Sequence, residues 1–343
     1  MQSRLLGGLT PRTFLRRHWQ KRPLFVRGAL PQFTGLIGKG ALAALAARDD
    51  VESRIVVRRG NRWETAHGPF AGIQVKPSNW TLLVSGVNMH VAAVDALLRR
   101  FQFIPQARLD DVMVSFATPG GGVGPHVDSY DVFLLQGPGR RRWRVGTRQY
   151  LTQPGDLLYL PPGLRHDGVA LEPCFTYSVG FRAPRGAELG AAFLDWLHER
   201  GLPEAAYRDP RLAPARHPGL LPGEMVEFAF RSLRRISWSR SDVAAFLGEY
   251  LTLPKPHVVF RPGRARRRLE RSMVRLDGKT QLLYSGRRFF MNGETLDVSG
   301  RLAPRLAELA DRRAASGAAL AVAPLAGLIC GWQRLGYLHF ERP

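Results

Sequence analysis

The sequence predicts an α+β protein in which a barrel or sandwich of short strands precedes a helical region and a mixed C-terminal segment. Between about residues 54 and 181, short β-rich runs alternate with glycine- and proline-containing turns, a pattern typical of closed or layered sheets. After Pro184, apolar residues repeat with helical spacing instead. The length of 343 residues allows two or three domains. A hydrophobic fraction of 45% is that of a globular chain.

The N-terminal part is predicted to mix helices and strands. Thr10 and Pro11 fit the cap and the first position of a helix, because a hydroxyl can accept a free helical N–H and proline has no N–H to satisfy. Helical spacing recurs at residues 42–47 and 91–101. Strands are expected at residues 23–26, 54–57, 72–75 and 80–86.

The central block is predicted to be almost entirely β-structure. Branched and aromatic residues dominate its apolar runs, and such residues favour strands. Pro162 and Gly163 fit the centre of a type II turn, since glycine takes the positive φ that this turn requires. The expected strands are residues 111–116, 130–136, 140–145, 157–160, 168–171 and 175–181.

The second half is predicted to be helical and then mixed. Residues 187–199, 225–236 and 243–251 have helical apolar spacing, with Ser241 as the expected cap of the last helix. The proline-rich residues 202–222 are typical of a linker. From residue 257 onward, strands at 282–284 and 288–291 flank a turn at Gly286. Helices from residues 302 and 324 and a last strand at 337–340 follow.

Composition and charge narrow the class of protein. The formal net charge is +22, and only five of the 50 basic residues are lysines. Two explanations of this arginine-rich charge are equally good. One is a coding bias toward arginine, and the other is a surface that works near polyanions such as ribosomal RNA. There is no apolar run of membrane-spanning length and no signal-peptide pattern, so we expect a cytoplasmic protein. Cys174 and Cys330 are expected to be free thiols.

His126, Asp128 and His166 form the strongest candidate site. Residues two apart on a strand point to the same side, so His126 and Asp128 can bind one ion. His166 follows the 162–163 turn, where a neighbouring strand of a barrel would supply a third ligand. Two imidazoles and one carboxylate leave open positions on a metal and suit non-haem Fe(II) oxygen chemistry. Ordinary core histidines and a zinc hydrolase site remain alternatives, although no base for the hydrolase is identifiable.

A glycine-rich loop at residues 119–124 leads into His126. It lacks the lysine of a phosphate-binding loop, so we expect its glycines to bring the backbone past the metal without side-chain collision. A second candidate is Arg141, because strand alternation places it on the inward face with Trp143 and Val145. A buried guanidinium needs an anion, and its planar fork matches a carboxylate such as the distal one of 2-oxoglutarate. A structural ion pair is the alternative. The outward face of this strand then carries Arg140, Arg142 and Arg144.

The chain resembles the bacterial ribosomal oxygenases of the Jumonji-C, or cupin-like, group. The resemblance rests on FLRRHWQKRPL at residues 14–24, DDVMVSF at 110–116, PGGGVGPHVDSYDVF at 119–133, GRRRWRVG at 139–146 and YSVGFRAP at 177–184. It is dense over residues 10–184 and mainly architectural afterwards. It implies a double-stranded β-helix, the cupin or JmjC barrel, over residues 1–203. A helical dimerisation segment at 204–256 and a winged-helix-like domain at 257–343 would follow.

The resemblance also implies an activity. Fe(II) would be held by His126, Asp128 and His166, Arg141 would bind the C5 carboxylate of 2-oxoglutarate, and O2 would be consumed. The bacterial members are protein hydroxylases that act on the β-carbon of an arginine (3-hydroxylation) in large-subunit ribosomal protein L-sixteen. Histidine hydroxylation of another ribosomal protein and oxidation of a small molecule remain alternatives. Tyr130, at even spacing from the first two ligands, is a candidate substrate contact or a core residue. Further acidic candidates for the substrate's guanidinium are Asp110, Asp111 and Asp131.

The expected partners are a ribosomal protein substrate and a second copy of the chain, with no membrane. Nucleic acid is a further candidate partner, because residues 261–268 form a basic run beside a winged-helix-like fold. The alternative for this run, which we favour, is a solvated basic segment on a domain that braces the dimer.

Overall fold

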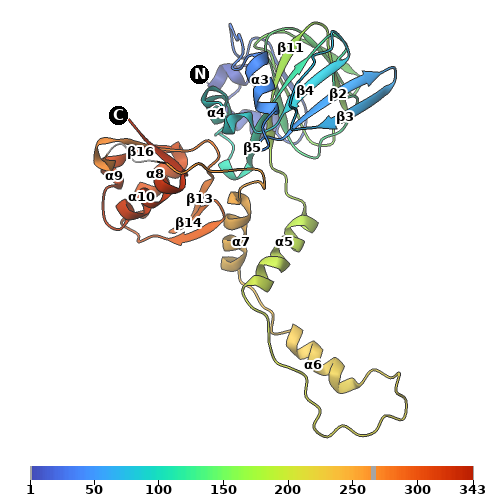
Figure 1. The fold of residues 1–343 in the computed structure, drawn as a ribbon, viewed down its shortest axis with the longest axis vertical. Helices are drawn as coiled ribbons and strands as arrows, with labels where there is room; N and C mark the ends of the chain where they lie inside the picture. Colours follow the sequence, from blue (N-terminus) through green and yellow to red (C-terminus); the bar gives the residue numbers. More distant parts are fainter. Residues whose placement is uncertain (1, 264–267, 343) are drawn as a thin grey trace.

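A computed structural model describes residues 2–263 and 268–342 of the chain. Figure 1 shows a strand-rich N-terminal unit, a helical arm that extends away from it, and a C-terminal unit beside the base of the arm. The predicted order of strands, helices and a mixed segment is therefore the order that the structure has.

Two antiparallel sheets make up the strand-rich unit. The chain alternates between them from β6 onward, as in a double-stranded β-helix. The larger sheet has the spatial order β1 (Leu24–Val26), β9 (Leu157–Leu160), β6 (Val132–Gln136), β11 (Cys174–Phe181), β5 (Leu109–Ala117), β4 (Trp80–Val84), β2 (Ser53–Arg59), β3 (Arg62–His67). The smaller sheet has the order β10 (His166–Ala170), β7 (Arg141–Val145), β8 (Arg148–Thr152).

The inner strands of the larger sheet are buried on both faces, as strand β6 shows. Its alternate side chains point to opposite sides. Phe133 and Leu135 join the main core outside the barrel, whereas Val132 and Leu134 join a smaller cluster inside it. The outer core is covered by helices α1 (Gln2–Leu5), α2 (Pro11–Arg17), α3 (Lys39–Ala46) and α4 (Ala92–Arg99). Full burial of each large apolar side chain contributes about 1.5–3 kcal/mol.

The arm consists of three helices, α5 (Gly186–Glu199), α6 (Gly223–Leu233) and α7 (Arg240–Thr252). Helix α5 packs on α7 through an apolar cluster that includes Trp196 and Phe246. Helix α6 lies at the far end of the arm (Figure 1), and none of its residues is buried. The predicted cap at Ser241 is wrong by two positions. Ser239 is the cap, because its hydroxyl accepts the Asp242 N–H while the Asp242 carboxylate accepts the Ser239 N–H.

The C-terminal unit has its own apolar core, built around Leu306, Ile329 and Trp332. Gly286 and Gly336 have positive φ at the predicted turn and helix end. Of the basic run at 261–268, residues 264–267 lie outside the described part of the chain. The elements of this unit are β12 (Met273–Leu276), β13 (Leu282–Ser285), β14 (Arg288–Met291), β15 (Glu294–Asp297), α8 (Ala303–Arg312), β16 (Ala314–Ser316), α9 (Gly317–Leu320), α10 (Leu325–Leu335) and β17 (Leu338–Glu341).

Three further expectations can be compared with the structure. The prediction of a strand at residues 72–75 is wrong, because the segment pairs with no strand of the described chain, although Ile73 packs on the main core. Strands β3 and β8 were not predicted, since they lie at sheet edges and carry few apolar residues. Cys174 and Cys330 are both free, as expected. Among the described residues, no helix is long and apolar enough to span a membrane.

Candidate metal centre

The structure brings His126, Asp128 and His166 together at the mouth of the barrel. The Asp128 carboxylate oxygens lie 3.8 Å from His126 Nε2 and 3.6 Å from His166 Nε2. Two ligands of one ion, each about 2.1 Å from it, are at most about 4.2 Å apart, so these distances fit one shared ion. The expectation that His126 lies on a regular strand is wrong. His126 forms a single bridge with His166, with backbone N–H···O distances of 3.0 and 2.9 Å.

Backbone carbonyls orient both imidazoles. Nδ1 of His126 lies 2.9 Å from the Gly124 carbonyl oxygen, and Nδ1 of His166 lies 3.0 Å from that of Leu164. Each Nδ1 therefore carries the proton and donates it, which leaves the Nε2 lone pair free for a metal. Burial lowers the pKa of His166, so its ring is held in the neutral form that a metal requires. This arrangement does not fit ordinary core histidines.

The glycine-rich loop is needed for close backbone approach to strand β10 and to Trp63. A Cβ on Gly122 would lie 2.4 Å from the Gly168 carbonyl oxygen of β10, and one on Gly124 would lie 2.7 Å from the Trp63 indole nitrogen. Gly124 also has φ +82°. The loop thus fits between β10 and Trp63, and this position sets the path of the chain into His126.

Arg141 points into the barrel, as strand alternation predicted, and it is 4% exposed. Its Nε and Nη2 atoms have no hydrogen-bond partner among the described residues, so no structural ion pair satisfies them. The Thr81 hydroxyl, on β4, is also buried without a partner and lines the same cavity. A buried charge whose N–H groups have no acceptor lowers the stability of the fold unless a bound anion accepts their hydrogen bonds. The residues present therefore fit a bound carboxylate, and 2-oxoglutarate supplies one.

One cavity of about 520 Å³ contains these groups. Tyr130 lines it but is 40% exposed, so it belongs to the rim rather than the core. Asp110 and Asp111 line it as well, whereas Asp131 is fully buried elsewhere and accepts the Tyr159 hydroxyl at 2.6 Å. Asp131 is thus a structural residue. Among the lining residues that the sequence interpretation missed are Thr81, Met113 and Lys255.

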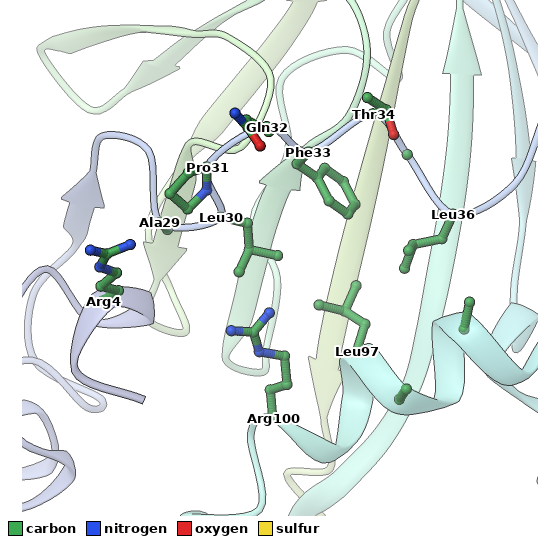
Figure 2. A pocket seen from close by; sticks show the side chains of 13 residues that line it. Arg4, Ala29, Leu30, Pro31, Gln32, Phe33, Thr34, Leu36, Leu97 and Arg100 are labelled. Carbon is green, nitrogen blue, oxygen red and sulfur yellow. The ribbon is translucent and has the colours of Figure 1, made fainter. Parts of the chain in front are cut away.

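Of these three, Thr81 leaves a signal in the sequence, as a hydroxyl inside the otherwise apolar strand Trp80–Val84. A second recess, of about 460 Å³, lies between helix α4 and the loop at residues 29–36 (Figure 2). Leu30, Phe33 and Leu97 form its apolar lining, with Arg4 and Arg100 at its edge. No carboxylate, imidazole or thiol lines it, so it has no metal-binding chemistry.

Fold and site together define the cupin-like, JmjC class of metal-dependent oxygenases. A JmjC-domain family matches residues 96–153 and 147–189, and a ROXA-like winged-helix family matches residues 235–339. The chain is 36% identical to the ribosomal protein uL16 3-hydroxylase of Escherichia coli, over 96% of this chain and 97% of that protein. The chain therefore belongs to the family of JmjC-domain ribosomal oxygenases.

Solved structures agree with this assignment. The Escherichia coli ribosomal oxygenase YcfD superposes with a TM-score of 0.83 and 36% identity, covering 97% of this chain and 98% of that one. A further structure of YcfD, in complex with cobalt and 2-oxoglutarate, matches with the same TM-score at 35% identity. Human ribosomal oxygenase 1 is 25% identical over 47% of this chain and 31% of its own length. The predicted JmjC barrel and winged-helix domain are thus confirmed.

Proposed function

We propose that this chain is an Fe(II)- and 2-oxoglutarate-dependent dioxygenase that 3-hydroxylates an arginine side chain of ribosomal protein uL16, the L-sixteen named above. One observation carries the proposal: the His126, Asp128 and His166 donors share a cavity with a buried guanidinium that has free N–H groups. The uL16 3-hydroxylase named above, 36% identical to this chain, supports the choice of substrate.

The residues of the cavity have separate tasks in this proposal. His126, Asp128 and His166 hold Fe(II), which together with 2-oxoglutarate and O2 supplies the oxidising chemistry. Arg141 and the Thr81 hydroxyl bind the C5 carboxylate and so fix the orientation of the co-substrate. The apolar residues Val132, Leu134 and Trp143 line the interior and exclude water from it.

Asp111 is the best placed receptor for the substrate guanidinium. It lies on β5 at the cavity wall and accepts the Gly86 N–H at 2.9 Å, which fixes its position. Burial raises the pKa of Asp111, and a neighbouring cation opposes that shift, so a bound guanidinium would favour its ionised form. Tyr130 stands at the rim. Its pKa is raised to about 12 by burial and by the Asp128 charge, so it stays protonated and can donate a hydrogen bond.

The test is turnover with purified uL16. The chain is incubated with Fe(II), 2-oxoglutarate and O2, and peptides are examined by mass spectrometry for a gain of one oxygen on an arginine, with succinate measured in parallel. Stoichiometric succinate and hydroxyarginine, both lost in H126A, support the proposal. Hydroxylation of a histidine in another ribosomal protein, or succinate release that depends only on a small molecule, would each replace it with the corresponding alternative.

We further propose that the arm mediates a homodimer. The apolar side chains of helix α6 are largely uncovered, because Met225 and Leu233 of the predicted face and the nearby Phe230 are 39%, 66% and 53% exposed in the single chain. A second copy would cover this surface. Light scattering after gel filtration should give twice the chain mass, and F230E/L233E should give the monomer. A monomeric unaltered chain would contradict the proposal.

A cytoplasmic location and the division at residues 203 and 256 also belong to this proposal. The substrate is a ribosomal protein, which places the enzyme with the ribosome. Helix α5 lies before residue 203 but packs on α7, so it links the proposed catalytic unit to the dimerisation segment. Nucleic acid is a proposed additional partner because of the positive net charge, and the proposed hydroxylation does not require it.

A further inference from the structure

A polar groove of about 600 Å³ lies on the outer side of the smaller sheet, on the face opposite the metal centre. Strand register places Arg144, Asp167 and Gln149 side by side on this face. Arg142 and Val169 form the next row. The β2–β3 hairpin forms the other wall with Arg58, Asn61 and Trp63. We call these lining residues the outer groove.

The outer groove has an excess of positive charge. Arg144 pairs with Asp167 at 3.3 Å, and Arg58 donates to the Gly60 carbonyl oxygen at 2.9 Å. Arg142 forms no ion pair with any residue that the structure describes, unlike its neighbour Arg140, which pairs with Glu172 at 3.0 Å. An adjacent recess adds Arg165. The outer groove itself has three arginines and one carboxylate, Asp167, and this excess of positive charge favours an anionic ligand.

The indole ring of Trp63 favours a nucleic acid over an acidic peptide as the anionic ligand. One part of its indole packs against the glycine-rich loop at Gly124, and the side chain remains half-exposed to the groove. The Arg58 guanidinium lies 5.6 Å from the ring centre. A nucleotide base can stack on such a ring while arginines hold the phosphates. An acidic peptide would use the arginines but would leave the indole without a matching planar partner.

We propose that the outer groove binds a single-stranded segment of RNA. Arg142, Arg144 and Arg58 contact its phosphodiester backbone, Trp63 stacks on one base, and the amides of Asn61 and Gln149 reach base edges. This function goes beyond the hydroxylation proposed above and does not depend on it, because no described residue lines both the outer groove and the metal cavity.

The test is fluorescence anisotropy with a labelled single-stranded RNA of mixed sequence, titrated with the full chain at several salt concentrations. We expect R142E/R144E to weaken binding by at least about tenfold. We also expect the slope of log K against log salt to fall by about 0.7 for each lost phosphate contact. W63A should weaken binding and W63F should retain it. The matched control is R301E/R305E, which makes the same charge change at exposed positions of the C-terminal unit.

The outcomes separate the alternatives. A loss confined to R142E/R144E, with peptide hydroxylation unchanged, supports the outer groove. Equal losses in both double variants would show unspecific ion exchange and overturn the proposal. A loss only in R301E/R305E would place RNA on the winged-helix unit and also overturn it. Tighter binding of a polyglutamate peptide than of RNA, with W63A unaltered, would show an acidic protein partner instead.

A different observation carries a second inference, which rests on the proposed arginine substrate. Lys255, in the segment after helix α7, extends into the metal cavity. Its Nζ lies 3.3 Å from Asp110 Oδ1 and 3.5 Å from Asp111 Oδ2. The Arg182 side chain donates to the Leu251 carbonyl oxygen at the end of helix α7, just before this segment, and so holds the end of α7 at the barrel. An internal cation therefore occupies the carboxylates that a substrate guanidinium would need.

We infer that Lys255 is a tethered competitor that the substrate arginine must displace. A guanidinium binds a carboxylate with two parallel hydrogen bonds, whereas an ammonium binds as a point charge. Lys255 thereby makes the site selective, since an arginine can displace it more readily than a substrate lysine can.

Steady-state kinetics with a uL16 peptide test this inference. K255M should lower the KM for the arginine peptide several-fold with kcat unchanged, and K255R should raise it, whereas the exposed control K76M should change neither. An unchanged or higher KM in K255M, while the unaltered enzyme is active, would overturn the role of Lys255 alone. An inactive unaltered enzyme would instead refute the proposed function on which this inference rests.

Discussion

Replacing Arg141 with methionine should affect co-substrate binding and protein stability in opposite directions. The guanidinium is 4% exposed and has two N–H-bearing atoms without partners among the described residues. Two charge-assisted hydrogen bonds to a carboxylate contribute about 1.5–3 kcal/mol each. Their loss should raise the KM for 2-oxoglutarate by about 10²- to 10⁴-fold, since 1.4 kcal/mol corresponds to a factor of ten.

Without co-substrate, the same substitution removes an uncompensated buried charge. Methionine is shorter but also unbranched and flexible, and it needs no hydrogen-bond partner, so the ligand-free R141M protein should unfold at the same temperature as the unaltered protein or higher. With a divalent metal already present in both samples, addition of 2-oxoglutarate should raise the unfolding temperature of the unaltered protein more than that of R141M.

Succinate release against 2-oxoglutarate concentration and thermal unfolding are the two assays. R142M is the matched control, because it removes the neighbouring, outward arginine of the same strand and should leave both values unchanged. A KM for 2-oxoglutarate within about threefold of the unaltered value would refute the reasoning. So would a strongly destabilised R141M protein, because that would mean that the guanidinium has a structural role.

Three other perturbations test the site and its support. D128N should weaken cobalt binding, measured by calorimetry, by more than about 100-fold, since loss of an outer partner alone costs 10- to 100-fold. G124A should lower the free energy of unfolding by about 1–2 kcal/mol from its positive φ, and further through the contact with Trp63. Burial lowers the pKa of His90 to about 4. In the unfolded chain this imidazole takes up a proton near pH 6.5, whereas in the folded protein it stays neutral down to about pH 4. The free energy of unfolding is therefore highest above about pH 6.5 and falls as the pH drops toward 4, and urea unfolding of H90Q should depend less on pH in this range.

Each of these predictions has a control in the same chain. D209N removes an exposed loop carboxylate and should not alter cobalt binding. G146A has φ +55° but no atom within 4 Å of the added Cβ, so it should cost only the conformational part. Equal destabilisation by G124A and G146A would contradict the packing argument. Parallel stability–pH curves for H90Q and the unaltered protein would contradict the assignment to His90.

Local sequence patterns predicted much of the fold around the site. Alternation along residues 140–145 placed Arg141 inward and Arg142 outward, because successive side chains of any strand point to opposite faces. The Pro162–Gly163 turn and the helix end at Gly336 were likewise predictable, since their positive φ values favour glycine. Edge strands such as β3 were missed because exposed edges need no apolar alternation.

The sequence by itself determined which side chains share a face and which residue types are available for a metal. The tertiary structure decided which distant segments meet. Only the bridge between His126 and His166 brings the two imidazoles to Asp128, and only the path after helix α7 carries Lys255 to Asp111. The outer groove likewise exists only because the β2–β3 hairpin lies beside the smaller sheet. The physical reason is that side-chain periodicity is a property of neighbouring residues, whereas pairing depends on the packing of the whole chain.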